Sequence, residues 1–159
     1  YLFHRSEGQE VLSAYHVTDG SLRWKHALPT SYSAQFGGTE GPSATPAADH
    51  QRVFALGASG KLRAVSATEG RLLWQVDCAE RFGAESGFFG FGSSPLLLGD
   101  RLIVQVGGPE ACVVAAPSIV WNRAASRLAV VNGNAPCAAI TGASAAGQSL
   151  LAAARTAPR

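Results

Sequence analysis

Short apolar runs alternate with turn residues along this chain, and the pattern recurs at a fixed interval. Residues 64–74 read Ala-Val-Ser-Ala-Thr-Glu-Gly-Arg-Leu-Leu-Trp, and residues 14–24, fifty positions earlier, read Ala-Tyr-His-Val-Thr-Asp-Gly-Ser-Leu-Arg-Trp. An Asp-Gly or Glu-Gly pair between two apolar runs is typical of a β-hairpin, because glycine adopts positive φ without steric cost. The pattern therefore predicts two equivalent strand-turn-strand units.

The sequence around these hairpins repeats as well. Residues 43–47 and 93–97 both place a proline just before an expected strand, and each is followed by a turn and an apolar run. We expect strands at residues 1–5, 11–17, 21–28, 53–56, 61–67, 102–106 and 112–115. Each full unit thus holds four short strands in about 50 residues, which is the content of one propeller blade.

A third copy of the hairpin is weaker, and the pattern then stops. Trp121 follows Trp74 after 47 residues, but Pro117 lies where the Asp-Gly pair would be. Proline removes a ladder donor, so we expect this hairpin to be shortened. Residues 122–159 hold thirteen alanines and none of the turn signals. A truncated propeller with a divergent end, a true alanine-rich tail and a shifted reading frame after about Ala115 are three competing explanations.

On these residues, the sequence resembles the PQQ-like (quinoprotein-type) β-propeller repeat family. Blades of this family end in a hairpin that opens with alanine and closes with tryptophan ten positions later. The positions that fit this frame are Ala14, Gly20, Trp24, Ala64, Gly70 and Trp74. Four positions depart from the family. Asp19 and Glu69 stand where the family usually has threonine, and His16 and Ser66 stand where it usually has aspartate. The resemblance implies that the tryptophans, including Trp121, pack over the glycine turns and latch adjacent blades.

The resemblance implies an all-β fold, a partial propeller of four-stranded antiparallel blades with about two to three repeats of a larger ring. We expect a blade end at 1–28, a full blade at 43–74, a further blade at 93–121 and an irregular alanine-rich segment at 122–159, partly helical or disordered. The implied function is a non-catalytic scaffold that presents loops to a protein or peptide in a bacterial periplasmic or envelope setting. The remaining blades of the ring would be a second partner. The alternative is a fragment of a quinoprotein-like oxidoreductase whose active-site blades lie elsewhere.

Composition narrows the class of protein. Apolar residues make up 47% and charged residues 15% of the 159 positions, which is typical of a globular chain. All eleven acidic residues lie at or before Glu110, and only four arginines follow, too sparse for a nucleic-acid-binding arm. No apolar run approaches the roughly 18–20 residues that span a bilayer, and no signal peptide is visible. Because methionine is absent even at position 1, we expect a piece of a longer product or a processed N-terminus.

The sequence shows little sign of catalytic or metal chemistry. Cys78, Cys112 and Cys137 are far apart, so the vicinal cysteines of a quinoprotein dehydrogenase are missing, and no acidic cluster suits Ca²⁺. We therefore expect no cofactor. A bridge between Cys78 and Cys112 is one option, but free buried thiols fit the odd number better. Glu80 and Glu85 lie close together in a predicted loop, and we interpret them as solvated charges rather than a catalytic pair. The four histidines lack the spacing of a zinc site.

Two long connections, residues 29–42 and 77–92, occupy equivalent places in successive repeats. We therefore expect both to project from the same face of the propeller. Loops on a rigid scaffold often carry function, and aromatic side chains are favoured in interfaces. The candidate interaction residues are Tyr32, Phe36, Phe82, Phe88, Phe89 and Phe91. The alternative is that these rings fold back to cover the seam between blades.

Overall fold

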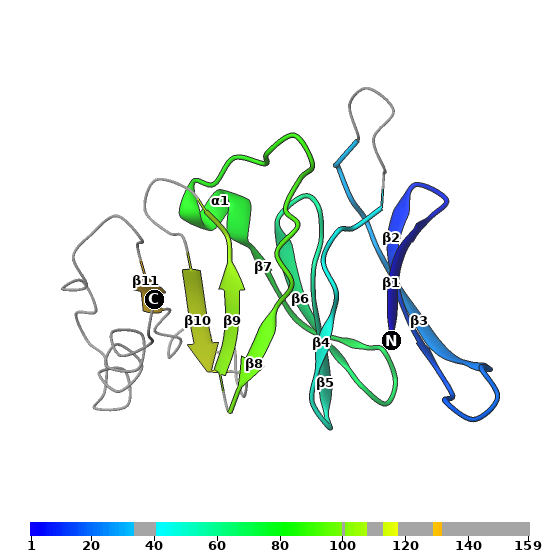
Figure 1. Ribbon diagram of the computed structural model, residues 1–159. Coiled ribbons are helices and arrows are strands. Elements are labelled where there is room, and N and C mark those ends of the chain that lie inside the picture. The colour runs from blue at the N-terminus through cyan, green and yellow to red at the C-terminus, as the bar shows by residue number, and fades with distance from the viewer. Residues whose placement is uncertain (34–40, 100, 108–112, 118–128, 132–159) are drawn as a thin grey trace, which may run out of the picture.

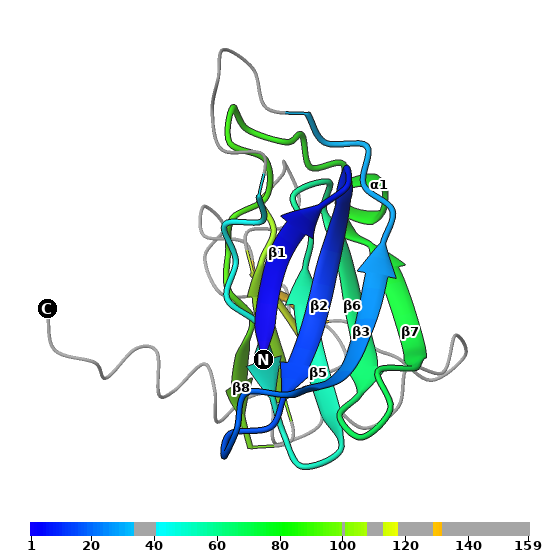
Figure 2. The ribbon, with the colours of Figure 1, turned by 90° about the vertical axis from the view of Figure 1, so that its right-hand side faces the viewer.

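Three antiparallel sheets stand side by side in the computed structural model, which describes residues 1–33, 41–99, 101–107, 113–117 and 129–131 (Figure 1). The first sheet has the order β1-β2-β3 and consists of β1 (Leu2–Ser6), β2 (Gln9–Tyr15) and β3 (Leu22–Leu28). Figure 2 shows this sheet from its outer side, with the second sheet behind it.

The second and third sheets have four strands each. The second has the order β4-β5-β6-β7: β4 (Ala47–Ala48), β5 (Arg52–Leu56), β6 (Lys61–Ser66) and β7 (Leu72–Asp77). The third consists of β8 (Leu96–Leu98), β9 (Arg101–Gln105), β10 (Val113–Pro117) and β11 (Ala129–Val131), in the same meander order. Because every strand pairs with its neighbour in sequence, each sheet is an up-and-down meander of the kind that forms one propeller blade. The fold is the partial β-propeller that the repeat predicts.

The two predicted hairpins are confirmed, and they are built alike. Ala14 lies opposite Trp24, and Ala64 lies opposite Trp74, with a register shift directly after each alanine. Gly20 has a φ of 70° and Gly70 a φ of 69°. These left-handed turns explain why glycine is placed where the chain reverses.

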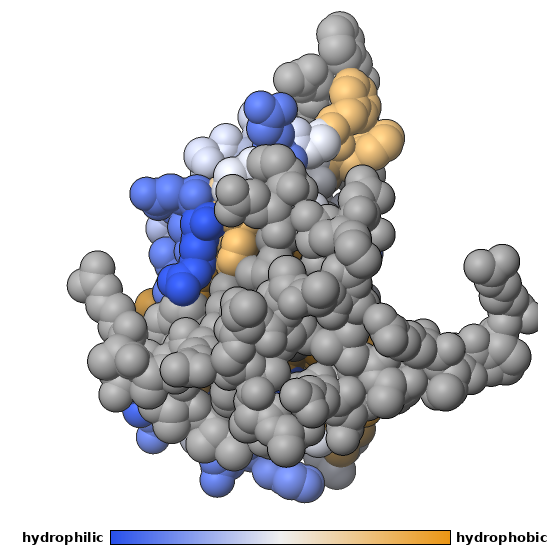
Figure 3. Space-filling model, turned by 90° about the vertical axis from the view of Figure 1, so that its left-hand side faces the viewer, coloured by the Kyte–Doolittle hydropathy of each residue, from blue (hydrophilic) through white to orange (hydrophobic). Residues whose placement is uncertain are grey.

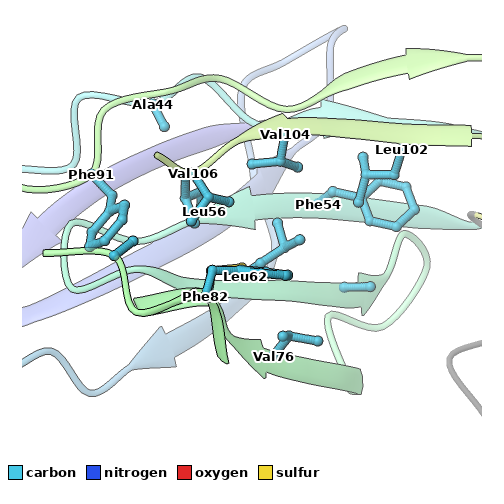
Figure 4. Close-up of a cluster of buried hydrophobic side chains, with 13 residues drawn as sticks. Ala44, Phe54, Leu56, Leu62, Val76, Phe82, Phe91, Leu102, Val104 and Val106 are labelled. Carbon is cyan, nitrogen blue, oxygen red and sulfur yellow. The ribbon is translucent and has the colours of Figure 1, made fainter. Parts of the chain in front are cut away.

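The core lies in the two seams between the sheets. Alternate residues of β5 point to opposite sides. Phe54 and Leu56 belong to the cluster shared with the third sheet (Figure 4), and Val53 belongs to the cluster shared with the first. All three side chains are fully buried. Burial on both faces explains why this strand reads as a continuous apolar run rather than an alternating one.

A one-turn helix, α1 (Cys78–Phe82), begins the connection from β7 to β8, where the sequence analysis expected only a loop. Asp77 caps it by accepting a hydrogen bond from the Glu80 backbone nitrogen at 3.1 Å. Gly83 ends it in the left-handed conformation with a φ of 57°. Five residues are too few for a helical periodicity to appear in the sequence. The signal that was present is the pair of caps, Asp77 and Gly83.

The third sheet closes differently from the first two. Pro117 is the last residue of β10, beyond the point at which β11 stops pairing, so its missing N–H removes no bond to that strand. Ala129 of β11 lies opposite Ala115. Trp121, predicted to close this blade, lies outside the described residues, as does the predicted tail apart from β11.

Candidate interaction face

Both long connections lie at the same end of the sheets, as the repeat predicts. In Figure 1 the segments from β3 to β4 and from β7 to β8 run over the top, whereas the β2–β3 and β6–β7 turns lie at the bottom. We call the top end, formed by residues 29–33, 41–46, 57–60 and 78–95, the loop face. Residues 34–40, among them the candidate Phe36, lie outside the described part of the chain.

Tyr32 joins the two connections. Its hydroxyl donates a hydrogen bond to the Phe88 carbonyl oxygen at 3.2 Å. Its ring lies over Gly90, where an added Cβ would be 3.1 Å from Tyr32 Cε2. Its own carbonyl accepts a hydrogen bond from Arg5 Nη1 at 2.9 Å, which ties the first connection to β1. Segments 56 residues apart in the sequence therefore share one surface.

The four candidate phenylalanines of the second connection divide into two pairs. Phe82 and Phe91 are buried, at 9% and 6% exposure, so they do fold back onto the core. Phe88 and Phe89 are 54% and 69% exposed. Their rings meet edge to face, with centroids 4.9 Å apart. Of these four rings, the second pair therefore presents the larger surface to solvent.

A hollow of about 600 Å³ opens beside the exposed pair. In Figure 3 an apolar patch stands out at the upper end of the molecule. Aromatic rings, serine hydroxyls and small residues form the walls of the hollow: Ser31, Tyr32, Ser33, Ser59, Ala79, Ser86, Gly87, Phe88 and Phe91. None of these lining side chains is charged.

The turn between β5 and β6, residues 57–60, lies beneath the hollow. Glu10, a fully buried residue of β2, holds this turn from across the seam. Glu10 Oε1 accepts a hydrogen bond from the Ala58 backbone nitrogen at 2.7 Å. A Cβ at Gly57 would overlap the other carboxylate oxygen, so glycine makes room for the group. Burial raises the pKa of Glu10, while the Ala58 hydrogen bond and the positive charges of Arg63 and Arg5 act in the opposite direction.

Sequence reasoning missed Glu10, although a signal was present. The apolar run that begins at Val11 follows this carboxylate directly, and Glu10 pairs with Leu28 inside the sheet. A charged residue in an otherwise buried strand indicates a specific partner. The identity of that partner, a backbone N–H 48 residues away, depends on how the two sheets pack.

Trp24 crosses the same seam at the opposite end. It is 8% exposed, and its indole Nε1 donates a hydrogen bond to the Ala67 carbonyl oxygen at 3.0 Å. Its ring covers Gly70, where an added Cβ would be 2.5 Å from Trp24 Cε3. By contrast, nothing lies within 4 Å of a Cβ added at Gly20. Trp74, half-buried, packs against the cluster that includes Phe54.

The described residues assemble little that could perform chemistry. They contain no group of three or more His, Cys, Asp or Glu side chains placed to hold a metal ion. Glu80 and Glu85 are both exposed. The Cys78 thiol is free, so the bridge to Cys112 considered above does not form, and burial raises its pKa to about 12.

No helix within the described ranges is long and apolar enough to cross a membrane.

Successive antiparallel meanders, packed face to face with a tryptophan across their seam, define the chain as part of a β-propeller. Within that class, the chain belongs to the family described as outer membrane protein assembly factor BamB, whose model matches residues 4–155. No curated protein sequence matches the chain.

Solved structures agree on the fold. BamB from Moraxella catarrhalis is 14% identical, with a TM-score of 0.50, over 72% of this chain and 35% of that one. Quinohemoprotein alcohol dehydrogenase from Comamonas testosteroni is 18% identical, with a TM-score of 0.50, over 96% of this chain and 22% of that one. The chain therefore spans about a third and about a fifth of these two proteins. At such identities the likeness shows the fold alone.

Proposed function

We propose that this chain is part of a non-catalytic β-propeller scaffold whose loop face binds a protein or peptide. The observation that carries the proposal is the exposed, edge-to-face pair of Phe88 and Phe89 on that face. Exposed aromatic side chains beside a concave surface are typical of the central residues of protein interfaces. The loops stand on buried sheets, so the pair is presented without a large ordering cost.

Family membership supports the setting of this function. The family is described as an outer membrane assembly factor, so we place the protein in the bacterial envelope, on the periplasmic side. In this proposal the first partner is a protein or peptide that docks on the loop face. The remaining blades of the same ring are the second.

Site-specific photo-crosslinking tests the proposal. A benzoylphenylalanine at position 89 should crosslink to one identifiable envelope protein, and mass spectrometry of the product should name it. The matched control carries the same probe at Leu72, which is 40% exposed but lies at the opposite end of β7. Equal crosslinking from both positions, or none from position 89, would contradict the proposal.

The alternative is a fragment of a quinoprotein-like oxidoreductase, and it predicts a different result. Because the active-site blades of this alternative would lie outside the chain, the test uses the longer protein with its complete ring of blades. Adding pyrroloquinoline quinone and Ca²⁺ to that protein should leave the absorption spectrum of the quinone unchanged if the scaffold proposal holds. A Ca²⁺-dependent shift of that spectrum, lost when the protein is unfolded, would favour the oxidoreductase instead.

A further inference from the structure

We propose that the hollow beside Phe88 holds one uncharged, apolar side chain of an extended peptide, while its serine hydroxyls bind the backbone of that peptide. This inference rests on the proposed function and names the chemistry of its partner. It also separates two parts of the loop face: the exposed aromatic pair supplies contact area, and the hollow selects which segment docks.

The size and lining of the hollow fit such an occupant. Its volume of about 600 Å³ lies inside the range of roughly 300–1,000 Å³ that is usual for pockets that bind drug-sized molecules, so it has room for a large apolar side chain together with the peptide backbone on either side of it. Rings of Tyr32, Phe88 and Phe91 supply apolar wall, and four serines supply hydroxyls. A side chain that enters would therefore exchange water for aromatic carbon on several sides.

The absence of charge from the lining sets the first part of the specificity. A carboxylate or ammonium group that entered the hollow would lose water and gain no counter-charge from the side chains that line it. Burying an unpaired charge is far more costly than burying an apolar group. We therefore expect phenylalanine or leucine at the central peptide position to bind, and aspartate or lysine there to be rejected.

The serine hydroxyls set the second part of the specificity, which concerns the peptide backbone. A serine hydroxyl offers one donor and two acceptor sites, which suits a single peptide N–H or carbonyl. Ser59 Oγ is buried and has no hydrogen-bond partner among the described residues. A buried hydroxyl without a partner is unfavourable, and rotation of the Ser59 side chain into the hollow would let a bound backbone group supply one. Sugars, with their neighbouring hydroxyls, are better matched by two-pronged carboxylate or amide side chains, which this lining lacks.

The walls are already fixed by hydrogen bonds. The Phe91 backbone nitrogen donates to the Ala58 carbonyl at 2.9 Å, and the Gly90 nitrogen donates to the Gly87 carbonyl at 2.9 Å. Together with the bond from Tyr32 to Phe88, they hold both sides of the hollow in place before anything binds. Preorganisation of this kind lowers the entropy cost of association.

Filling the hollow provides a sharp test. Gly87 lines it, has no positive φ, and has open space around an added Cβ, so Gly87→Leu should occupy the hollow without straining the backbone. The matched control is Gly41→Leu, at a glycine of the other connection that is equally open and lies outside the lining. Circular dichroism of both variants should match that of the unmodified chain.

The probe is a fluorescein-labelled Gly-Ser-Phe-Ser-Gly peptide, measured by fluorescence anisotropy with the full chain. We expect binding that Gly87→Leu weakens by about tenfold or more and that Gly41→Leu leaves unchanged. Versions of the peptide with aspartate or lysine in place of phenylalanine should also bind about tenfold or more weakly.

Several outcomes would overturn the inference: no binding of the phenylalanine peptide, equal binding of the charged peptides, equal binding by the Gly87→Leu variant, or displacement of the peptide by maltotriose. In each of these cases, crosslinking from position 89 would still report on the proposed function. Persistent crosslinking would leave the scaffold proposal standing without the hollow. Loss of crosslinking as well would remove both.

Discussion

A comparison of Gly20→Ala with Gly70→Ala measures the contact across the first seam. The two glycines occupy equivalent hairpin turns, with φ values of 70° and 69°. They differ in what lies over them: Gly20 has nothing within 4 Å of an added Cβ, whereas Gly70 is covered by the ring of Trp24. The difference between the two substitutions therefore isolates the tryptophan contact from the backbone cost.

The expected magnitudes follow from that geometry. Alanine in the left-handed conformation costs about 1 kcal/mol, and this is the whole cost expected at Gly20. At Gly70 the new methyl would be 2.5 Å from Trp24 Cε3, so the ring must move. Displacing the ring gives up part of the roughly 3–5 kcal/mol that a buried tryptophan contributes, along with a hydrogen bond worth about 1 kcal/mol. We expect Gly70→Ala to cost about 2 kcal/mol more than Gly20→Ala.

A double-mutant cycle with Trp24→Ala completes the test. Once the ring is removed, Gly70→Ala should cost only the backbone term, so the coupling between the two positions should be about 2 kcal/mol. The assay is urea unfolding of the full chain followed by far-UV circular dichroism, which is insensitive to the loss of an indole fluorophore. If Gly20→Ala and Gly70→Ala differ by less than about 0.5 kcal/mol, the tryptophan does not latch this seam and the reasoning fails.

Three further predictions test single groups. Because Cys78 is 1% exposed and its pKa is raised to about 12, iodoacetamide should label it at least about 1,000-fold more slowly in the folded chain than in urea; equal rates, by mass spectrometry, would refute this. Because the folded-state pKa of Glu10 is raised above 4.5, its contribution to the free energy of unfolding should fall as pH rises from 4.5 through the folded pKa. Glu10→Gln, which keeps an acceptor for Ala58, should flatten that fall in urea titrations; an unchanged slope would refute it. Tyr32→Phe removes the bond to Phe88 and should cost about 0.5 kcal/mol or less, yet speed chymotrypsin cleavage at Phe88; an unchanged cleavage rate would count against it.

Much of the fold could be predicted from the sequence because local rules and the repeat agree. The Asp-Gly and Glu-Gly turns specify the hairpins, and the fifty-residue interval aligns each alanine with the tryptophan opposite it. The same repeat placed both long connections at one end of the sheets. It could not reveal α1, whose five residues are determined by the Asp77 cap and Gly83 rather than by an apolar stripe.

The loop face shows where prediction from the sequence ends and why. From the sequence alone, the phenylalanines of the second connection could not be told apart. The burial of Phe91 depends on the backbone groups of Ala58, in the turn after β5. The Phe91 nitrogen reaches the Ala58 carbonyl, which draws its ring over Gly60 into the core. The Ala58 nitrogen in turn is held by Glu10 from the neighbouring sheet. Phe88 and Phe89 lie in the turn that the Gly90 nitrogen closes by donating to the Gly87 carbonyl, and both rings are exposed. The burial of Phe91 thus involves a turn that is held by a carboxylate 48 residues away, a contact that only the packing of two sheets creates.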